Sequence, residues 1–303
     1  MPIIIPKDIP AYDILTGERI FVMGDKRAMA QDIRPLEIAI LNLMPTKVET
    51  ETQLMRMLSN SPLQVNITLI KTASYSATNV SQKHMDRFYH VFDDIKEKRF
   101  DGLIVTGAPV ETLDFTDVKY WDELCKIMDY AERNVTSTIF ICWGAQAALR
   151  YYYGIGKREL PKKVFGIFDN EIKMENDPLL RGLNDVFKVP HSRHTEINEK
   201  MLREDGRVVI LAEGDECGLS IAKSIDNKQF FIFGHSEYDR ETLSKEYLRD
   251  VSKGLDIDKP KNYYIGEGTD KIDMSWRSTG TLLFSNWLNY YVYQVTPYDI
   301  GGC

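Results

Sequence analysis

The chain has 303 residues, a net charge of −7 and 43% hydrophobic residues. This composition is typical of a globular protein and argues against nucleic acid as the main partner, because the Lys and Arg residues form no basic tail or stripe. The sequence has no run of about eighteen apolar residues and no recognisable signal peptide, so we expect neither a membrane span nor export. The four cysteines are scattered and form no CxxC pair, which favours a reducing cytoplasm over disulfides or a structural zinc site.

The first half of the chain alternates apolar runs with amphipathic segments. Strands are predicted at residues 38–43, 65–70, 102–106 and 137–141. Helices are predicted between them at residues 48–58, 81–98 and 117–132, the first with Thr46 as its N-cap. This alternation predicts an α/β fold with a doubly wound, mostly parallel sheet and helices on both faces.

The pattern changes after about Gly154. Short strands are predicted at residues 164–167, 186–189, 208–211, 218–222 and 230–233, at a spacing typical of hairpins. We therefore expect a mixed or antiparallel extension of the same sheet. A charged helix is predicted at 240–255, a polar loop at 256–276, and an aromatic-rich helix at 281–293 that is either core or a dimer face. Without a linker or repeat, we expect a single domain over residues 1–303.

Cys142 ends the fourth predicted strand and precedes a helix-forming run of small residues. This order predicts a sharp strand-to-helix turn with the thiol at its apex. The start of a helix favours an anionic thiolate, because the backbone dipole places positive charge there. Cys142 is therefore the candidate nucleophile, whereas the other cysteines have no activating neighbours.

A cysteine nucleophile needs a base, and a second group that orients the base. His235 follows the strand at 230–233, and Glu237 lies two residues further on, where it can accept the second imidazole N–H. By itself this pair also fits an ordinary turn. His84 and His90 fall in a predicted helix, and His191 and His194 in a predicted loop; no further ligands at a usual spacing complete a metal site.

A third strand end, at residues 105–111, runs into a glycine turn. Its backbone N–H groups, together with the N–H of Trp143, would form an oxyanion hole beside Cys142. An ordinary turn between a strand and a helix has the same composition, so this signal is weak alone.

The segment around Cys142 and the later His-x-Glu resemble class I glutamine amidotransferases. The sequence more closely resembles the bacterial homoserine O-acyltransferase family, which shares that fold. The resemblance extends from residue 1 to about residue 297 and is carried by residues 1–6 (MPIIIP), 40–47 (ILNLMPTK), 189–195 (VPHSRHT) and 234–238 (GHSEY).

The resemblance implies an acyl-thioester on Cys142, with His235 as general base and Glu237 as its orienting partner. It also implies that Lys163, Ser192 and Arg249 contact homoserine; a surface Lys, a loop hydroxyl and an Arg paired with Glu246 or Asp250 are the ordinary alternatives. Lys47 is a weaker candidate. The resemblance further suggests a cytoplasmic homodimer without a cofactor or metal, which makes a precursor of methionine.

Glu111 bears on the acyl donor. In the family that the chain resembles, glycine at this turn accompanies succinyl donors and glutamate accompanies acetyl donors. A carboxylate here would repel the distal carboxylate of a succinyl group, so we expect acetyl-CoA. Succinyl-CoA as donor, glutamine hydrolysis by the same three residues, and a non-enzymatic member of the fold are the alternatives.

Overall fold

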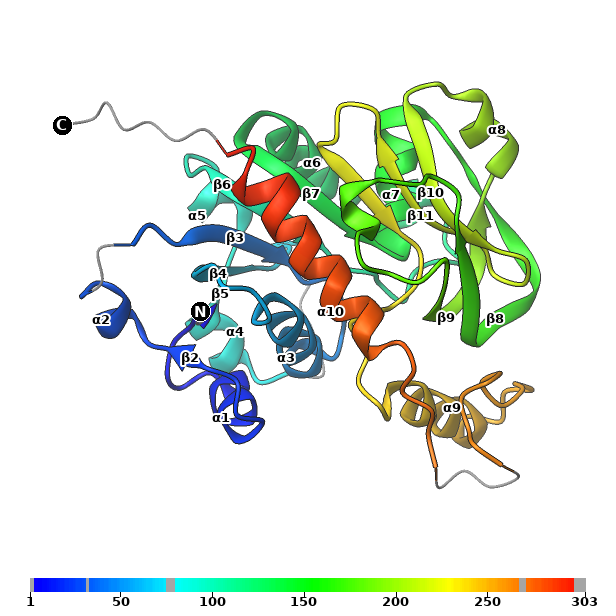
Figure 1. Cartoon of the computed structure of the whole chain (residues 1–303), viewed down its shortest axis with the longest axis horizontal. Helices are drawn as coiled ribbons and strands as arrows, with labels where there is room; N and C mark the ends of the chain where they lie inside the picture. The colour runs from blue at the N-terminus through cyan, green and yellow to red at the C-terminus, as the bar shows by residue number, and fades with distance from the viewer. Residues whose placement is uncertain (1–2, 31–32, 75–79, 267–270, 297–303) are drawn as a thin grey trace.

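The computed structural model describes residues 3–30, 33–74, 80–266 and 271–296. Its strands are β1 (Ile3–Ile4), β2 (Val22–Met23), β3 (Leu36–Leu41), β4 (Val65–Ile70), β5 (Tyr89–His90), β6 (Phe100–Val105), β7 (Val135–Ile141), β8 (Lys157–Ile172), β9 (Val186–Ile197), β10 (Val208–Gly214), β11 (Gly218–Ser224) and β12 (Gln229–Ile232). They form one twelve-stranded sheet in the order β2-β1-β4-β3-β6-β7-β12-β11-β10-β8-β9, with β5 beside β4 (Figure 1).

The helices complete the alternation that the sequence predicts. The α-helices are α1 (Pro10–Gly17), α2 (Asp25–Ala28), α3 (Lys47–Leu58), α4 (Gln82–Phe88), α5 (Phe92–Ile95), α6 (Trp121–Asn134), α7 (Trp143–Tyr153), α8 (Glu199–Glu204), α9 (Thr242–Ser252) and α10 (Arg277–Asn286). Two 3-10 turns, η1 (Phe115–Asp117) and η2 (Pro178–Leu180), and a π-helix, η3 (Trp287–Tyr293), are also present. None of the described helices is long and apolar enough to cross a membrane.

The sheet has a parallel and an antiparallel part. Pairing is parallel from β2 through β12, and the strands β11, β10, β8 and β9 continue the sheet in antiparallel pairs. The predicted mixed extension is thus confirmed. The boundary between the two parts lies beside β7 and β12, the strands that carry Cys142 and His235.

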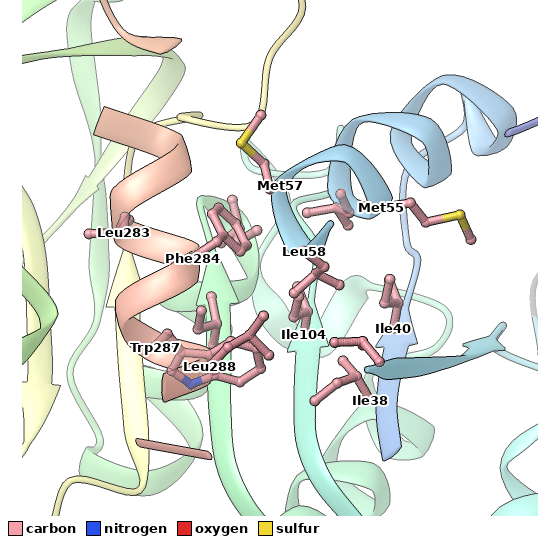
Figure 2. Packing of buried hydrophobic residues seen from close by; sticks show 14 of the residues in the cluster. Ile38, Ile40, Met55, Met57, Leu58, Ile104, Leu283, Phe284, Trp287 and Leu288 are labelled. Atoms are coloured by element: carbon pink, nitrogen blue, oxygen red, sulfur yellow. The ribbon is translucent and has the colours of Figure 1, made fainter. Parts of the chain in front are cut away.

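Side chains alternate between two hydrophobic layers. On β3, Ile38 and Ile40 face one layer, which includes α3 and α10, while Ala39 and Leu41 face the other, which includes α6 and α7. Figure 2 shows Phe284 and Trp287 packed toward Ile104 and Leu58 in the first layer. This period-two pattern is what a strand covered on both faces requires.

The sequence prediction was wrong for the helix at 81–98. That segment is interrupted at Tyr89 and His90, which pair with Leu69 and Ile70 as a short parallel strand. The carboxylate of Asp94 then accepts the Val91 N–H at 3.1 Å, at the start of α5. Strand pairing and a new helix start therefore override the helical periodicity.

The aromatic-rich C-terminal segment belongs to the core. Trp287 is 0% exposed and Phe284 1% exposed, and the indole N–H of Trp287 donates to Ser137 Oγ at 2.9 Å. In Figure 1, α10 and the π-helix η3 that follows it cross one face of the sheet. Of the two readings that the sequence left open, the core reading is correct for these side chains.

Candidate active site

Three strand ends meet at one edge of the sheet. β7 lies between β6 and β12, and all three run parallel, with Ile141 opposite Ile232 and Phe140 opposite Val105. Cys142 directly follows β7, Gly107 lies two residues beyond β6, and His235 lies three residues beyond β12. The carboxyl edge of the sheet therefore places the predicted nucleophile, base and glycine turn together.

Cys142 occupies a strained turn. Its φ of 50° and ψ of −115° are unusual for a residue with a side chain, and such a conformation costs on the order of 1–3 kcal/mol. Gly144, in the first turn of α7, packs so closely that a Cβ there would lie 2.8 Å from the Thr106 carbonyl oxygen. The predicted elbow is confirmed, and glycine at 144 allows it to pack directly against the end of β6.

His235 and Glu237 form a buried pair. The two side chains are 5% and 7% exposed, and His235 Nδ1 lies 2.7 Å from Glu237 Oε1. Burial disfavours a charged imidazole, but the negative charges of Glu237 and Cys142, and hydrogen bonds to both, raise the pKa of His235 well above its usual value. Tyr238 stacks on the imidazole at 4.2 Å between ring centroids and holds its plane.

The space beside the thiol is bounded by Gly107. A Cβ at this position would lie 3.3 Å from Cys142 Cβ and 3.7 Å from His235 Cε1. Trp143 is the first residue of α7, where an N–H has no acceptor within the helix. The turn after β6 and the Trp143 amide thus flank the thiol, as the predicted oxyanion hole requires.

A cavity of about 240 Å³ opens next to this group. Its wall includes Gly107, His235 and Glu237 together with Glu246 and Arg249 of α9. A small polar molecule in the cavity would therefore contact the catalytic pair and α9 at once.

Lys163, Ser192 and Arg249 come together around Glu246. Glu246 Oε1 accepts from Lys163 Nζ at 2.6 Å and from Ser192 Oγ at 2.7 Å, and Arg249 Nη2 lies 3.7 Å away. The Arg249 guanidinium also donates to Asp250 Oδ1 at 2.8 Å through Nε. The three predicted residues therefore lie close together, and Arg249 also forms the ordinary ion pairs with Glu246 and Asp250.

Lys163 and Ser192 do not lie where the ordinary alternatives, a surface lysine and a loop hydroxyl, would place them. The Lys163 side chain is only 8% exposed, so it is not a surface lysine. Ser192 lies within β9, because this strand extends from Val186 to Ile197 and pairs with β8. The same pairing corrects the expectation of a loop at His191 and His194, which are strand residues.

Glu111 is held by residues of β9. Its Oε2 accepts the His194 N–H at 2.8 Å and lies 3.3 Å from Thr195 Oγ1. Thr195 Oγ1 in turn donates to Gln146 Oε1 of α7 at 2.9 Å. The carboxylate is therefore fixed by β9, and through Thr195 it is connected to the helix that begins at the nucleophile.

Lys47 is directed into the core at the start of α3. Its ammonium donates to the Asn42 carbonyl and lies 5.7 Å from the centroid of the Tyr89 ring. Burial lowers its pKa to about 8, against the attraction of Glu51. The neighbouring Thr46 lines the cavity, although its side chain makes no capping hydrogen bond, contrary to the prediction.

Comparison with known proteins identifies the family. The family model for homoserine O-succinyltransferase matches residues 2–298. The chain belongs to the homoserine O-succinyltransferase family. A relative from Petrotoga mobilis, named homoserine O-acetyltransferase, is 52% identical over all of this chain and 98% of that protein. Another of the same name, from Clostridium novyi, is 54% identical over 99% of each.

Solved glutamine amidotransferases share the fold. One from Thermotoga maritima matches with a TM-score of 0.57 and 11% identity, over 84% of this chain and 97% of that chain. One from Methylobacillus flagellatus matches with a TM-score of 0.56 and 13% identity, over 85% and 95%. The predicted fold class and the family resemblance are both confirmed, and likeness at this level of identity concerns the fold alone.

The sequence did not indicate that Glu246 contacts Lys163 and Ser192, or that Thr195 contacts Gln146. Glu246 entered only as an ordinary ion-pair partner of Arg249. A sequence signal existed, because Glu246 precedes Arg249 by three residues and so lies on the same face of α9. The contact between Thr195 and Gln146 joins residues 49 apart, and no local pattern indicates it.

The remaining histidines do not form a metal site. His191 is fully buried, and burial together with nearby Arg193 lowers its pKa well below the usual value, so it is neutral. His84 Nε2 lies 3.0 Å from Glu51 Oε1 in the core. In the part of the chain that the structure describes, no group of three His, Cys, Asp or Glu side chains is placed to hold a metal ion.

Proposed function

We propose that the chain is a homoserine O-acetyltransferase that carries the acetyl group on Cys142. The observation that supports this most directly is the meeting of Cys142, His235 and Glu237 beside one cavity, in a member of this family. Glutamine hydrolysis would use the same three residues, but the full-length similarity to proteins named homoserine O-acetyltransferase favours acyl transfer.

In the first half-reaction, the Cys142 sulfur attacks the acetyl-CoA carbonyl as a thiolate. Glu237 engages Nδ1 of His235, and the other ring nitrogen holds the proton taken from the thiol, as the raised pKa of His235 favours. The oxygen of the tetrahedral intermediate accepts hydrogen bonds from the Trp143 N–H and the turn at Gly107. The C–S bond to CoA then breaks, the departing sulfur takes the proton back from His235, and a thioester remains on Cys142.

In the second half-reaction, homoserine discharges the thioester. Its ammonium suits the Glu246 carboxylate, and its carboxylate suits the planar guanidinium of Arg249. Lys163 and Ser192 hold Glu246 in place from β8 and β9. His235 removes the proton from the homoserine hydroxyl as the oxygen attacks, and returns it to the Cys142 sulfur as O-acetylhomoserine leaves.

Acetyl-CoA is the proposed donor because of Glu111. The family model takes its name from succinyl transfer, whereas the relatives described above are named for acetyl transfer. A carboxylate held by the His194 N–H leaves no donor at this position for the distal carboxylate of succinyl-CoA. Repulsion between the negative charges of Glu111 and of the succinyl carboxylate would disfavour the succinyl donor further.

The test is release of CoA from acetyl-CoA that depends on homoserine. We expect turnover with the intact chain and none with Cys142→Ala. Cys217→Ala is the matched control, because Cys217 is a buried cysteine whose pKa burial raises to about 11. Release of ammonia from glutamine, or faster turnover with succinyl-CoA, would contradict the proposal.

We further propose that the active form is a cytoplasmic homodimer of a single 303-residue domain without a bound cofactor or metal. The family resemblance supports the dimer, and the scattered cysteines support the compartment. Sedimentation of the purified chain measures the oligomeric state, and a monomer with full activity would contradict the dimer.

A further inference from the structure

A large groove adjoins the active-site cavity and has no part in the mechanism above. It has a volume of about 990 Å³ and is lined by α1, α3, residues 238–241 and the start of α10. We call it the α3 groove, because α3 packs against both α1 and α10 (Figure 1). Glu49, Tyr238 and Lys245 line both the groove and the active-site cavity, so the two spaces adjoin at these side chains.

Two of the cations in the α3 groove are already neutralised. Arg56 lies 2.6 Å from Glu18 and 2.5 Å from Asp239. Lys245 lies 3.0 Å from Glu49. These pairs shape the wall and have little remaining capacity to bind an anion.

Two exposed arginines in the groove remain without an acidic partner. Arg240 donates to the Ile272 carbonyl at 2.6 Å, and Arg277 contacts Met274 Sδ at 3.5 Å. Neither forms an ion pair with any carboxylate of residues 3–30, 33–74, 80–266 or 271–296. Glu241 is the opposing carboxylate on this wall, close enough to Lys245 to attract it. Two arginines of the groove, Arg240 and Arg277, thus lack an ion pair, against one such carboxylate, that of Glu241.

The same groove offers apolar surface. Ile14 and Ile20 line it beside α1, and Met57 and Met274 line it beside α3 and α10. Apolar side chains, a flexible thioether and guanidinium planes together suit a flat aromatic base attached to phosphates.

We propose that the α3 groove binds the nucleotide end of the acyl-CoA, with Arg240 and Arg277 contacting its phosphates. The pantetheine arm would run past Tyr238 toward Cys142, between Glu49 and Lys245, whose ion pair would open to admit it. This inference rests on the proposed function, because it concerns the donor of that reaction. It adds a phosphate-binding site remote from the reacting thioester.

A cleft beside Glu111 is the competing location. It has a volume of about 340 Å³ and contains Arg150, Lys157 and Arg158. Arg158 is paired with Glu196 at 2.6 Å, and the Lys157 ammonium is occupied by the carbonyls of Glu111 and Leu113. Arg150 donates to the Gly154 carbonyl at 3.4 Å and is the one arginine of this cleft without an ion pair among the described residues. This cleft shares no lining residue with the active-site cavity, so the α3 groove is favoured.

The experiment compares acetyl-CoA with acetylpantetheine, which carries the same thioester without the nucleotide. Arg240→Gln and Arg277→Gln are tested singly and together, and Arg158→Gln tests the competing cleft. Loss of one charge-assisted phosphate contact should lower kcat/KM for acetyl-CoA about tenfold, mainly through KM, and leave kcat/KM for acetylpantetheine unchanged. Arg158→Gln should alter neither.

The outcomes separate this inference from the proposed function. Equal loss with both donors would show that the arginines act on folding or chemistry, and would overturn the inference. Wild-type values retained by the double variant, or a loss confined to Arg158→Gln, would also overturn it. A wild-type chain that transfers acetyl from neither donor would refute the proposed function, and this inference with it.

Discussion

Removing the charge at Glu111 should change the choice of acyl donor. The Glu111 carboxylate is held by the His194 N–H at 2.8 Å and by Thr195, so it cannot swing away from an incoming succinyl carboxylate. Two like charges 4 Å apart repel by about 1 kcal/mol in water and by about 4 kcal/mol near a protein surface. Because Glu111 is only partly buried, we expect about 1–3 kcal/mol, a preference for acetyl-CoA of roughly tenfold to a hundredfold.

Two variants separate charge from space. Glu111→Gln keeps the side-chain volume and an oxygen that can accept the His194 N–H, and removes only the negative charge. The loss of electrostatic repulsion alone should therefore raise the succinyl-to-acetyl ratio of kcat/KM. Glu111→Gly also frees the His194 N–H and the Thr195 hydroxyl as donors for the succinyl carboxylate, and should raise the ratio further. The assay is CoA release at saturating homoserine with each donor. An unchanged ratio in both variants would refute the reasoning.

Three further predictions concern the remaining charged groups. Glu237→Gln should lower kcat about 10²- to 10⁴-fold, because His235 loses the carboxylate that orients it and raises its pKa; kcat within twofold of wild type would remove Glu237 from the mechanism. Glu246→Gln should raise KM for homoserine about tenfold while acetylation of Cys142 keeps its rate; an equal loss in both half-reactions would contradict its assignment to homoserine. Burial lowers the pKa of Lys47 from 10.5 to about 8, so between these values the unfolded chain binds the extra proton and stability rises with pH. Urea unfolding from pH 8 to 10.5 should therefore show wild type gaining about 3 kcal/mol relative to Lys47→Met, and parallel curves would contradict a buried Lys47 with a lowered pKa.

Strands β3, β4, β6, β7 and β12 of the parallel part could be predicted because each is a mostly apolar run, whereas the two-residue strands β1, β2 and β5 are too short to give such a pattern. Residues 65–70 match β4 at both ends, and the elbow at Cys142 follows from an abrupt change of local propensity. Carboxyl ends of parallel strands share an edge, so the meeting of Cys142 and His235 follows once β7 and β12 pair.

Features set by distant contacts could not be predicted from local patterns. Tyr89 and His90 leave the helical pattern because β1 covers only the start of β4, so that Leu69 and Ile70 at its end are open for pairing on that side. Lys163 is buried because Glu246, 83 residues later in the chain, accepts its hydrogen bond. The role of Glu246 as the centre of this cluster is visible only in three dimensions, since its partners come from β8, β9 and α9.

The central claim is that Cys142 carries the acetyl group between the two substrates. Intact-protein mass spectrometry after incubation with acetyl-CoA alone tests it most directly, with peptide mapping to locate the modification. We predict the added mass of one acetyl group on Cys142, lost when homoserine is supplied and absent in Cys142→Ala. Homoserine-dependent CoA release without any acetylated Cys142, or an acetyl group on another residue that homoserine discharges, would contradict the account.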